Sequence, residues 1–278
     1  MRSVLVTGGT VRLGKAVAER LRTEGWRVIT SSHRADAGAD IVADLAQPMG
    51  AVRLYAAALQ MLGGPPPDAL VNNAALFTGD AAAIAAVNLE APRKLTTLMA
   101  GRESGVGAVV NVLDSAILGS LGSLESLGSL ESLRSLESLR SLESLRSLGS
   151  GGSTLSDANQ TPSDSKRLEP LGSGASTQSD ANQTLNDPKR PYLDSKRGLL
   201  AFTRTAAATF AASLRVNAVA PGPVLAPTGV HVKAGATLLD RRPTAEDVAA
   251  AVSYLLSAES VTGAVIPVDA GQHLLEAD

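Results

Sequence analysis

The sequence predicts one α/β domain with a doubly wound parallel sheet, covered by helices on both faces. Three observations favour this fold. Short apolar runs rich in Val and Ile alternate with longer stretches of helical periodicity. A glycine-rich turn follows the first apolar run, and a chain of 278 residues with 44% hydrophobic side chains can bury a large core.

The alternation begins with an apolar strand over residues 4–7, which ends at Gly8-Gly9 and is followed by a helix over about 13–24. Short β-branched runs separated by helical patterns continue it. The next expected strands are 26–30, 41–43, 69–71 and 107–113, and the next expected helices are about 48–62 and 80–101. Near residue 190 the alternation resumes with a helix over 192–213, a strand over 214–219, a helix over about 245–257 and a strand over 264–268.

A central block interrupts this order. From Leu118 to Leu148 leucine recurs at every third position, and a polar stretch follows in which Ser-Asp-Ala-Asn-Gln-Thr occurs twice. A period of three leaves no lasting apolar stripe on an α-helix, because each step of three advances about 300° around the axis. Glu and Arg three residues apart would nevertheless support a helix. The block is therefore either disordered or a helix that packs elsewhere. We expect an insertion over 118–189 between two parts of one domain, 1–117 and 190–278.

The composition excludes several classes of function. A formal net charge of −2 and a pI near 6.0 give no electrostatic reason to expect nucleic acid or an anionic membrane as a partner. The absence of cysteine excludes disulfides, thiol nucleophiles and thiolate metal sites. The three histidines lie too far apart for a local metal motif, so no metal is expected. No apolar run reaches the roughly 18 residues of a membrane span, and the chain opens without a secretory signal. A cytoplasmic protein acting on a small molecule is expected.

The first turn, Thr7-Gly8-Gly9-Thr10-Val11-Arg12-Leu13-Gly14, joins a predicted strand to a predicted helix. Glycines let the backbone approach a pyrophosphate, and the N-terminus of the helix stabilises its charge. The alternative is a glycine-rich turn without a ligand. Taken alone, the spacing favours a dinucleotide site.

Further motifs follow in a fixed order: Leu70-Val-Asn-Asn-Ala-Ala75, Tyr192-Leu-Asp-Ser-Lys196, Leu214-Arg-Val-Asn-Ala-Val-Ala-Pro-Gly222 and Gly263-Ala-Val-Ile-Pro-Val-Asp269. Together with the glycine turn, they resemble the short-chain dehydrogenase/reductase family on both sides of the central block. The resemblance implies a Rossmann-type domain, a nicotinamide cofactor and hydride transfer. It also implies a homotetramer built from the helices at about 80–101 and 192–213 and the C-terminal strand.

Tyr192 and Lys196 are one helical turn apart, so they project from one face toward the same ligand. A phenol with a pKa near 10 is a poor proton donor at neutral pH unless its anion is stabilised, and a nearby ammonium group provides that stabilisation. By resemblance, Tyr192 protonates the substrate and Lys196 also binds the nicotinamide ribose. Asn88 matches the family's helix asparagine, which supports a proton-relay water. A surface Tyr–Lys pair and a structural asparagine are the alternatives.

The third catalytic position departs from the family pattern, because Asp114 lies where serine is usual. Strand alternation would direct Ser115 to the opposite side of the chain. An aspartate here resembles the pteridine reductases. Arg12 matches their arginine that contacts cofactor phosphate and pterin, and Phe77 matches the aromatic residue that stacks on the pterin ring. Phe77 could instead be a core residue. The implied substrate-binding residues are Arg12, Phe77, Asp114 and Tyr192.

The predicted end of the second strand indicates the cofactor. An acidic residue there would hold a ribose 2′-hydroxyl, whereas a basic residue accommodates a 2′-phosphate. The chain has Ser32, His33 and Arg34, with no carboxylate before Asp36, so NADPH is expected. Arg34 and Arg12 could clamp the phosphate, or Arg34 could be a solvated loop charge. By resemblance the remaining cofactor-binding residues are Gly8, Leu13, Gly14, Asp44, Leu45, Asn72, Ala74, Asn111, Pro221 and Gly222, together with Tyr192 and Lys196.

Two classes of function follow from the sequence. The first is an NADPH-dependent reductase of a pterin, a dihydropterin or another carbonyl or quinone. The second is a nucleotide-binding or assembly protein whose chemistry was lost when the central block expanded, because 78 residues separate Asp114 from Tyr192. The presence of Asp114, Tyr192 and Lys196 together favours the enzyme.

Overall fold

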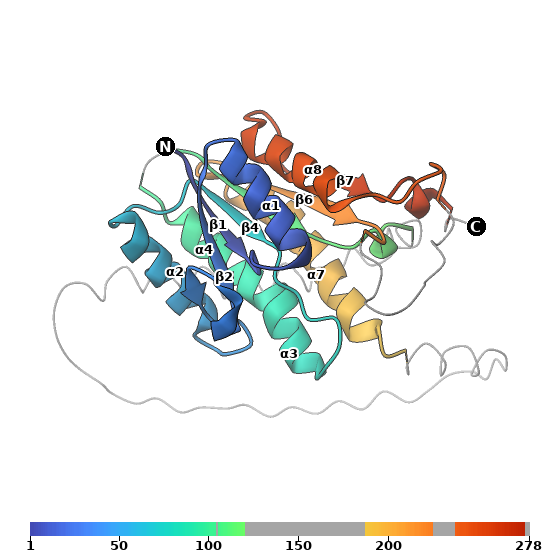
Figure 1. The fold of residues 1–278 in the computed structure, drawn as a ribbon, viewed down its shortest axis with the longest axis horizontal. Coiled ribbons are helices and arrows are strands. Elements are labelled where there is room, and N and C mark those ends of the chain that lie inside the picture. The colour runs from blue at the N-terminus through green and yellow to red at the C-terminus, as the bar shows by residue number, and fades with distance from the viewer. Residues whose placement is uncertain (104, 120–186, 225–236, 276–278) are drawn as a thin grey trace, which may run out of the picture. The chain divides into compact units, whose positions relative to one another are not determined.

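Seven parallel strands form one sheet (Figure 1). Their spatial order is β3 (Ile41–Val42), β2 (Arg27–Ser32), β1 (Ser3–Thr7), β4 (Ala69–Asn72), β5 (Gly107–Val112), β6 (Leu214–Pro221) and β7 (Val265–Val268). The chain builds outward from β1 to β3, then returns to the other side of β1 and builds outward to β7. This reversal confirms the predicted doubly wound fold, and it opens a crevice where the carboxyl ends of β1 and β4 diverge.

The structure is a computed structural model that describes residues 1–103, 105–119, 187–224 and 237–275. All of them belong to one unit, made of Met1–Gly122 and Thr184–Asp278. The predicted insertion over 118–189 lies outside the described residues except at its two ends. The helical or disordered character of the period-three block, and the three domain boundaries, therefore remain predictions.

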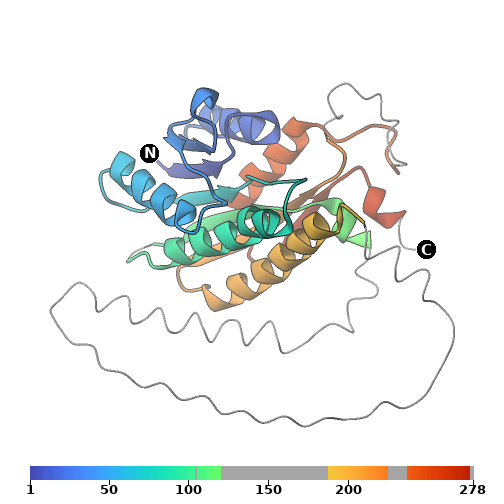
Figure 2. The same cartoon turned by 90° about the horizontal axis from the view of Figure 1, so that it is seen from below.

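Helices cover both faces of the sheet (Figure 2). On one face, α1 (Arg12–Thr23) and α8 (Ala245–Ser257) pack together over the strands. On the other face lie α2 (Gly50–Leu62), α4 (Ala91–Ala100) and α7 (Arg190–Thr209). Because side chains alternate along a strand, Val4 and Val6 enter the core beneath α1 and α8, whereas Leu5 enters the core beneath α2 and α4.

The expected helix over 80–101 consists of three parts. They are α3 (Ala81–Ala85), a π-helical turn η2 (Ala86–Glu90) and α4. Asp80 caps α3, since its carboxylate accepts hydrogen bonds from the backbone N–H groups of Ala82 (3.0 Å) and Ala83 (3.2 Å). Pro92 has no N–H to donate to the carbonyl of Asn88, which accounts for the interruption of regular α-helix here.

Other boundaries differ by a few residues from the expected ones. The helix α7 begins at Arg190 and ends at Thr209, and β6 continues to Pro221 because Pro221 is still in register with Val268 of β7. The ends of β2 also lie later than expected, because Ser32 still pairs with Val42. None of the helices in the described parts of the chain has an apolar stretch long enough to cross a bilayer.

Candidate active site

A cavity of about 1430 Å³ lies at the carboxyl ends of the central strands. This volume exceeds that of a typical small-molecule pocket, about 300–1000 Å³, and is large enough for a dinucleotide and a second ligand. Sixteen of the sequence-predicted site residues line it: Gly8, Arg12, Leu13, Gly14, Ser32, His33, Arg34, Asp44, Leu45, Ala74, Phe77, Asp114, Tyr192, Lys196, Pro221 and Gly222.

The glycine turn between β1 and α1 forms one wall of the cavity. Gly8 and Arg12 both have positive φ, 63° and 50°, so the backbone folds tightly before the helix begins. A Cβ at Gly14 would lie 2.1 Å from the carbonyl oxygen of Gly8, and only glycine allows this approach. No described side chain caps α1 at Val11. The first N–H groups of the helix are therefore available to an anion in the cavity.

Asn73 and Thr7 join this turn to β4, a contact that the sequence analysis missed. The Asn73 amide donates to the carbonyl oxygens of Thr7 (2.9 Å) and Gly8 (3.1 Å). The Thr7 hydroxyl in turn accepts hydrogen bonds from the backbone N–H groups of Asn73 and Ala74, each at 3.0 Å. The Asn72-Asn73 pair after an apolar run is the signal that could have indicated it. The cavity lining also includes Lys189, Arg242 and Gln272, which the sequence analysis did not select.

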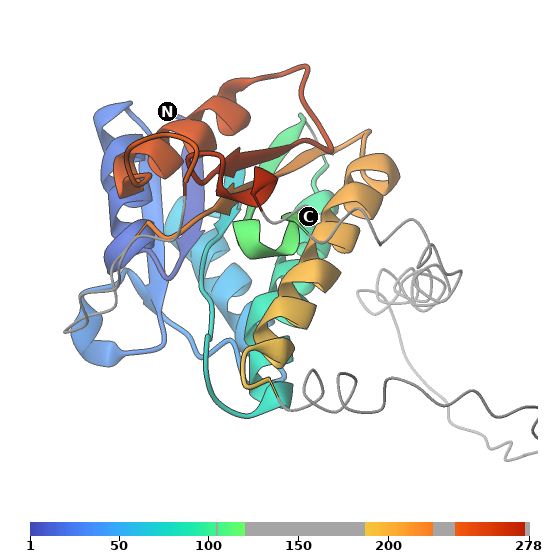
Figure 3. The ribbon, with the colours of Figure 1, turned by 90° about the vertical axis from the view of Figure 1, so that its right-hand side faces the viewer.

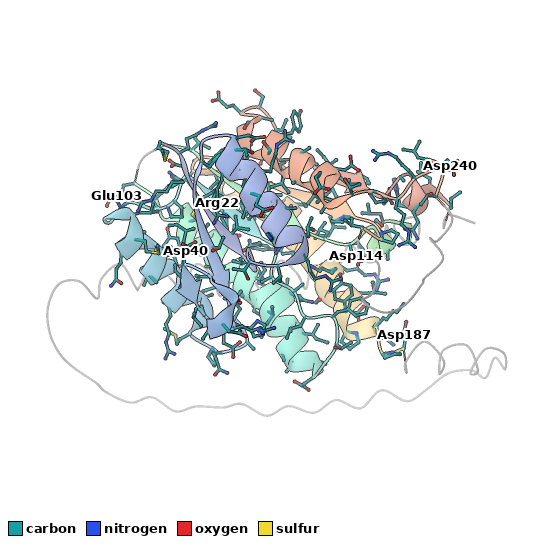
Figure 4. The ribbon with its side chains drawn as sticks, in the orientation of Figure 1. Arg22, Asp40, Glu103, Asp114, Asp187 and Asp240 are labelled. Atoms are coloured by element: carbon teal, nitrogen blue, oxygen red, sulfur yellow. The ribbon has the colours of Figure 1, made fainter. Side chains whose placement is uncertain are left out.

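Asp114 and Tyr192 meet at one end of the cavity, on the other side of the glycine turn from the residues that follow β2. Asp114 follows β5, and its Oδ1 accepts a hydrogen bond from the N–H of Ala116 at the start of η3 (Ser115–Ile117). Its Oδ2 accepts a hydrogen bond of 2.8 Å from the Tyr192 hydroxyl on α7. Figure 4 labels Asp114 in the same half of the molecule as Asp187, which precedes α7, and away from Arg22 and Glu103. The fold thus brings together two residues 78 positions apart in the sequence.

Burial changes the acidity of the two α7 residues. Tyr192 is 8% exposed, and burial, the Asp114 charge and the Asp114 hydrogen bond all raise its pKa. Lys196 is 3% exposed, and burial lowers its pKa to about 8, against the opposing attraction of Asp114. The Lys196 Nζ donates to the carbonyl oxygen of Val112 (2.7 Å) and lies 5.7 Å from the centre of the Tyr192 ring. The site therefore holds a neutral phenol between a carboxylate and an ammonium group.

Phe77 is half exposed at the mouth of the cavity, so it is not a core residue. Its ring centre lies 4.6 Å from that of Tyr192, with 54° between the ring planes. The two rings form an aromatic wall against which a planar ligand could stack.

Three predicted residues, Asn72, Asn88 and Asn111, are not part of the cavity lining. Asn88 bonds with its side-chain amide to the backbone of Leu76, as donor at 2.8 Å and acceptor at 2.7 Å, and donates to the Ser195 hydroxyl at 3.1 Å. Since Ser195 donates to the carbonyl oxygen of Tyr192, Asn88 helps to fix the turn of α7 that carries Tyr192. The proton-relay water expected beside Asn88 remains a prediction.

The side chains of Asn72 and Asn111 form a buried chain with Thr203 of α7. Asn72 donates to Asn111 (2.8 Å), which donates to the Thr203 hydroxyl (2.9 Å). The Asn72 Oδ1 is buried without a hydrogen-bond partner among the described residues. This chain ties β4 and β5 to α7 below the cavity, and Figure 3 shows α7 alongside α4 on that side.

The far end of the cavity, after β2, is polar and exposed. Arg34 forms a two-pronged ion pair with Asp36, from Nε to Oδ1 (3.0 Å) and from Nη2 to Oδ2 (2.6 Å). Asp44 accepts hydrogen bonds from the backbone N–H of Ala46 and from the Gln47 side chain, and these bonds lower its pKa. The cavity thus has one buried end with a phenol and one exposed end with a guanidinium.

Comparison with known proteins identifies the family. A family model described as enoyl-(acyl carrier protein) reductase matches residues 162–273. The "Granaticin polyketide synthase putative ketoacyl reductase 2" of Streptomyces violaceoruber is 31% identical over 306 residues, covering 98% of this chain and 96% of that protein.

Solved structures agree in fold. FolM alternative dihydrofolate reductase 1 from Brucella canis, in complex with NADP, is 26% identical with a TM-score of 0.66, covering 98% of this chain and 94% of that one. The 3-alpha-hydroxysteroid dehydrogenase from a Pseudomonas species, in complex with NADH, is 23% identical with a TM-score of 0.67. The match covers 98% of this chain and 97% of that one. The ketoacyl reductase matches nearly the full length of the chain, and the glycine turn and the Tyr192–Lys196 pair line one cavity. The chain therefore belongs to the short-chain dehydrogenase/reductase family.

Proposed function

We propose that the protein is an NADPH-dependent reductase that transfers hydride to a pterin or dihydropterin, with Tyr192 as the proton donor. The observation that carries this proposal is the hydrogen bond of 2.8 Å between Asp114 and Tyr192 in the cavity. Because the Asp114 carboxylate lies beside the Tyr192 hydroxyl, it restricts which substrates can bind in position to be protonated by Tyr192.

The cavity suits a dinucleotide with phosphate at the glycine turn. The uncapped start of α1 and the close approach of Gly14 to Gly8 leave N–H groups and space for a pyrophosphate. Gly8, Arg12, Leu13 and Gly14 would hold this part of the cofactor. The FolM structures from Brucella canis and Brucella suis are NADP complexes, which supports NADPH as the cofactor of this chain.

The reaction adds a hydride and a proton across a C=N bond. The nicotinamide, when bound, supplies the hydride. Tyr192 donates its hydroxyl proton to the substrate nitrogen. The buried ammonium of Lys196, 5.7 Å from the Tyr192 ring, stabilises the tyrosinate that remains.

Asp114 favours a substrate with N–H donors over a ketone. A ketone oxygen gains negative charge during reduction, and an ionised carboxylate beside it offers no hydrogen bond and repels that charge. A pterin carries amino and ring N–H groups that can donate to Asp114. Its planar ring can also lie against Phe77 at the cavity mouth.

A second candidate is a ketone reductase of other specificity. The ketoacyl reductase at 31% identity favours it, since that name denotes reduction of a carbonyl group. In that case Tyr192 and Lys196 keep their roles, and the hydrogen bond to the ketone oxygen comes from Tyr192 alone of the three residues.

A substrate panel tests the proposal. NADPH oxidation is followed with dihydrobiopterin, dihydrofolate, a quinone and an acetoacetyl thioester, for the natural protein and for Asp114→Ser. We expect turnover of a dihydropterin, a loss of at least about tenfold in kcat/KM for it in Asp114→Ser, and a gain for the ketone in that variant. Faster ketone than dihydropterin turnover by the natural protein would contradict the pterin assignment. Tight NADPH binding without turnover of any substrate would favour a nucleotide-binding protein without chemistry.

We further propose that the protein is cytoplasmic and that it forms a homotetramer, the latter as the family resemblance implies. Sedimentation analysis of the full chain measures the number of subunits, and a stable monomer would exclude the tetramer.

A further inference from the structure

Arg34 and Asp36 occupy the end of the cavity where the sequence places cofactor selection. Both line the cavity, and their side chains are 63% and 70% exposed. The contact joins two N–H donors of the guanidinium to two oxygens of one carboxylate, at 3.0 and 2.6 Å. This is the fork geometry with which an arginine also binds a phosphate.

The loop that carries the pair is fixed at both ends. The Ser32 hydroxyl accepts a hydrogen bond from the N–H of Arg34 (3.1 Å). Further along, the Asp40 carboxylate accepts hydrogen bonds from the N–H (2.8 Å) and hydroxyl (2.7 Å) of Thr30 in β2. Asp36 lies on the short 3₁₀ turn η1 (Ala35–Ala37), two residues after Arg34. The two side chains are therefore held near each other by the loop itself.

We propose that Asp36 moderates the preference for NADPH over NADH by competing with the 2′-phosphate of NADPH for the fork of Arg34. This inference rests on the proposed function, since it requires the cofactor in this cavity. Arg34 lowers the pKa of Asp36, so the carboxylate is ionised at neutral pH. A phosphate that takes the Nε–Nη2 edge of Arg34 displaces this carboxylate. NADH has no phosphate there, so its binding leaves the pair intact.

The competition moderates selectivity for NADPH rather than abolishing it. The pair is exposed to water, and exposed ion pairs shift an equilibrium by at most about fivefold. A 2′-phosphate carries more negative charge than one carboxylate. At a sufficient concentration of NADPH it therefore displaces Asp36 from Arg34. Asp36 therefore raises the Kd for NADPH and leaves the Kd for NADH unchanged, so the two dissociation constants differ less than they would without it.

A double-mutant cycle on the full chain tests the proposal by fluorescence titration of Kd for NADPH and NADH. In Asp36→Asn we expect Kd for NADPH to fall about two- to fivefold at low salt, and Kd for NADH to stay within about 1.5-fold. In Arg34→Leu, Kd for NADPH rises, and adding Asp36→Asn to Arg34→Leu produces no further change. Glu19→Gln is the matched control, because it removes one exposed carboxylate from the ion pair with Lys15 on α1, away from the cavity lining.

Each other result overturns the proposal. Weaker NADPH binding in Asp36→Asn would mean that Asp36 orients Arg34 for the phosphate. If Asp36→Asn tightened NADPH binding equally in the natural and Arg34→Leu backgrounds, or if Glu19→Gln tightened it too, the cause would be a general loss of negative charge. An unchanged Kd would mean that the phosphate does not displace Asp36. Failure of the proposed function is distinguishable: NADPH binding without turnover would contradict the reductase and leave this titration valid, whereas a natural protein that binds no NADPH would contradict both.

Discussion

The two ends of the cavity each hold a carboxylate bonded to a partner, but in opposite surroundings. Asp114 bonds to Tyr192, which is buried, and lies near Lys196, which is also buried. Asp36 bonds to Arg34, and both side chains are exposed. At the buried end, loss of water moves the pKa of the phenol up and that of the ammonium down. At the exposed end, water screens the pair. Under the two proposals, burial therefore suits the Asp114 end to proton transfer and exposure suits the Asp36 end to adjusting cofactor affinity.

The largest expected effect is at the buried end. Tyr192→Phe removes the hydroxyl that we propose as the proton donor and keeps the ring that packs against Phe77. We expect kcat/KM for the reducible substrate to fall by about 10²–10⁴, with the Kd for NADPH changed less than about threefold. Tyr254→Phe is the matched control, since Tyr254 is exposed on α8. If Tyr192→Phe kept its activity, Tyr192 would not be the proton donor, and the buried end of the cavity would not be the site of proton transfer.

The glycine turn between the two ends gives the next largest effect. Gly14→Ala places a Cβ 2.1 Å from the Gly8 carbonyl oxygen, so we expect a loss of about 3 kcal/mol in unfolding free energy and weaker NADPH binding. In Gly101→Ala the nearest atom is 3.5 Å from the new Cβ and φ is −73°. That control should change stability by less than about 1 kcal/mol. Urea unfolding measures both variants, and equal losses would contradict the steric argument.

The buried amide chain beneath the cavity gives a smaller effect. Thr203→Val keeps the side-chain shape and leaves the Asn111 amide without its acceptor at 2.9 Å. We expect about 1–3 kcal/mol of lost stability. Thr205→Val is the control, because the Thr205 hydroxyl is bonded to a backbone carbonyl on the exposed side of α7. A stability unchanged in Thr203→Val would show that water replaces the lost partner.

The smallest effect expected is a pH dependence of activity. Lys196 has a pKa of about 8, so kcat/KM for reduction should fall about tenfold between pH 7 and pH 9 as the ammonium loses its proton. Stability changes in the opposite sense. From about pH 8 to 10.5 the unfolded chain keeps a proton on Lys196 that the folded chain has lost, so this residue makes the fold more stable as pH rises.

Tyr192 acts on stability only above its ordinary pKa of 10, where its raised pKa makes folding less favourable as pH rises. Measuring kcat/KM and the urea midpoint together between pH 7 and 9 separates the two effects. A parallel fall of both would mean that the protein unfolds rather than losing the charge of Lys196.

The sequence predicts the order of strands and helices because β-branched runs and helical periodicity are local signals. It also predicts the motif residues that line the cavity, such as Gly14, Tyr192 and Lys196, since their spacing is local too. It does not predict that Asn72 and Asn111 turn into the core, because an amide at the end of a strand can face either way. The contact of Asn73 with Thr7 joins positions 66 apart and leaves no periodic trace. The interruption of the helix at Ala86–Glu90 depends on Pro92 and on buried bonds of Asn88 to a distant loop.

The separation of Asp114 from Tyr192 in sequence has a consequence for the covalent chain. The described residues stop at Gly119 and resume at Asp187, and the hydrogen bond between Asp114 and Tyr192 joins the two parts of the domain beside this break. The strands on either side, β5 and β6, are paired in register over six residue pairs. A chain divided between Gly119 and Asp187 would give two polypeptides, each with one strand of the β5–β6 pair, and this parallel pairing would favour their association, as in fragment complementation.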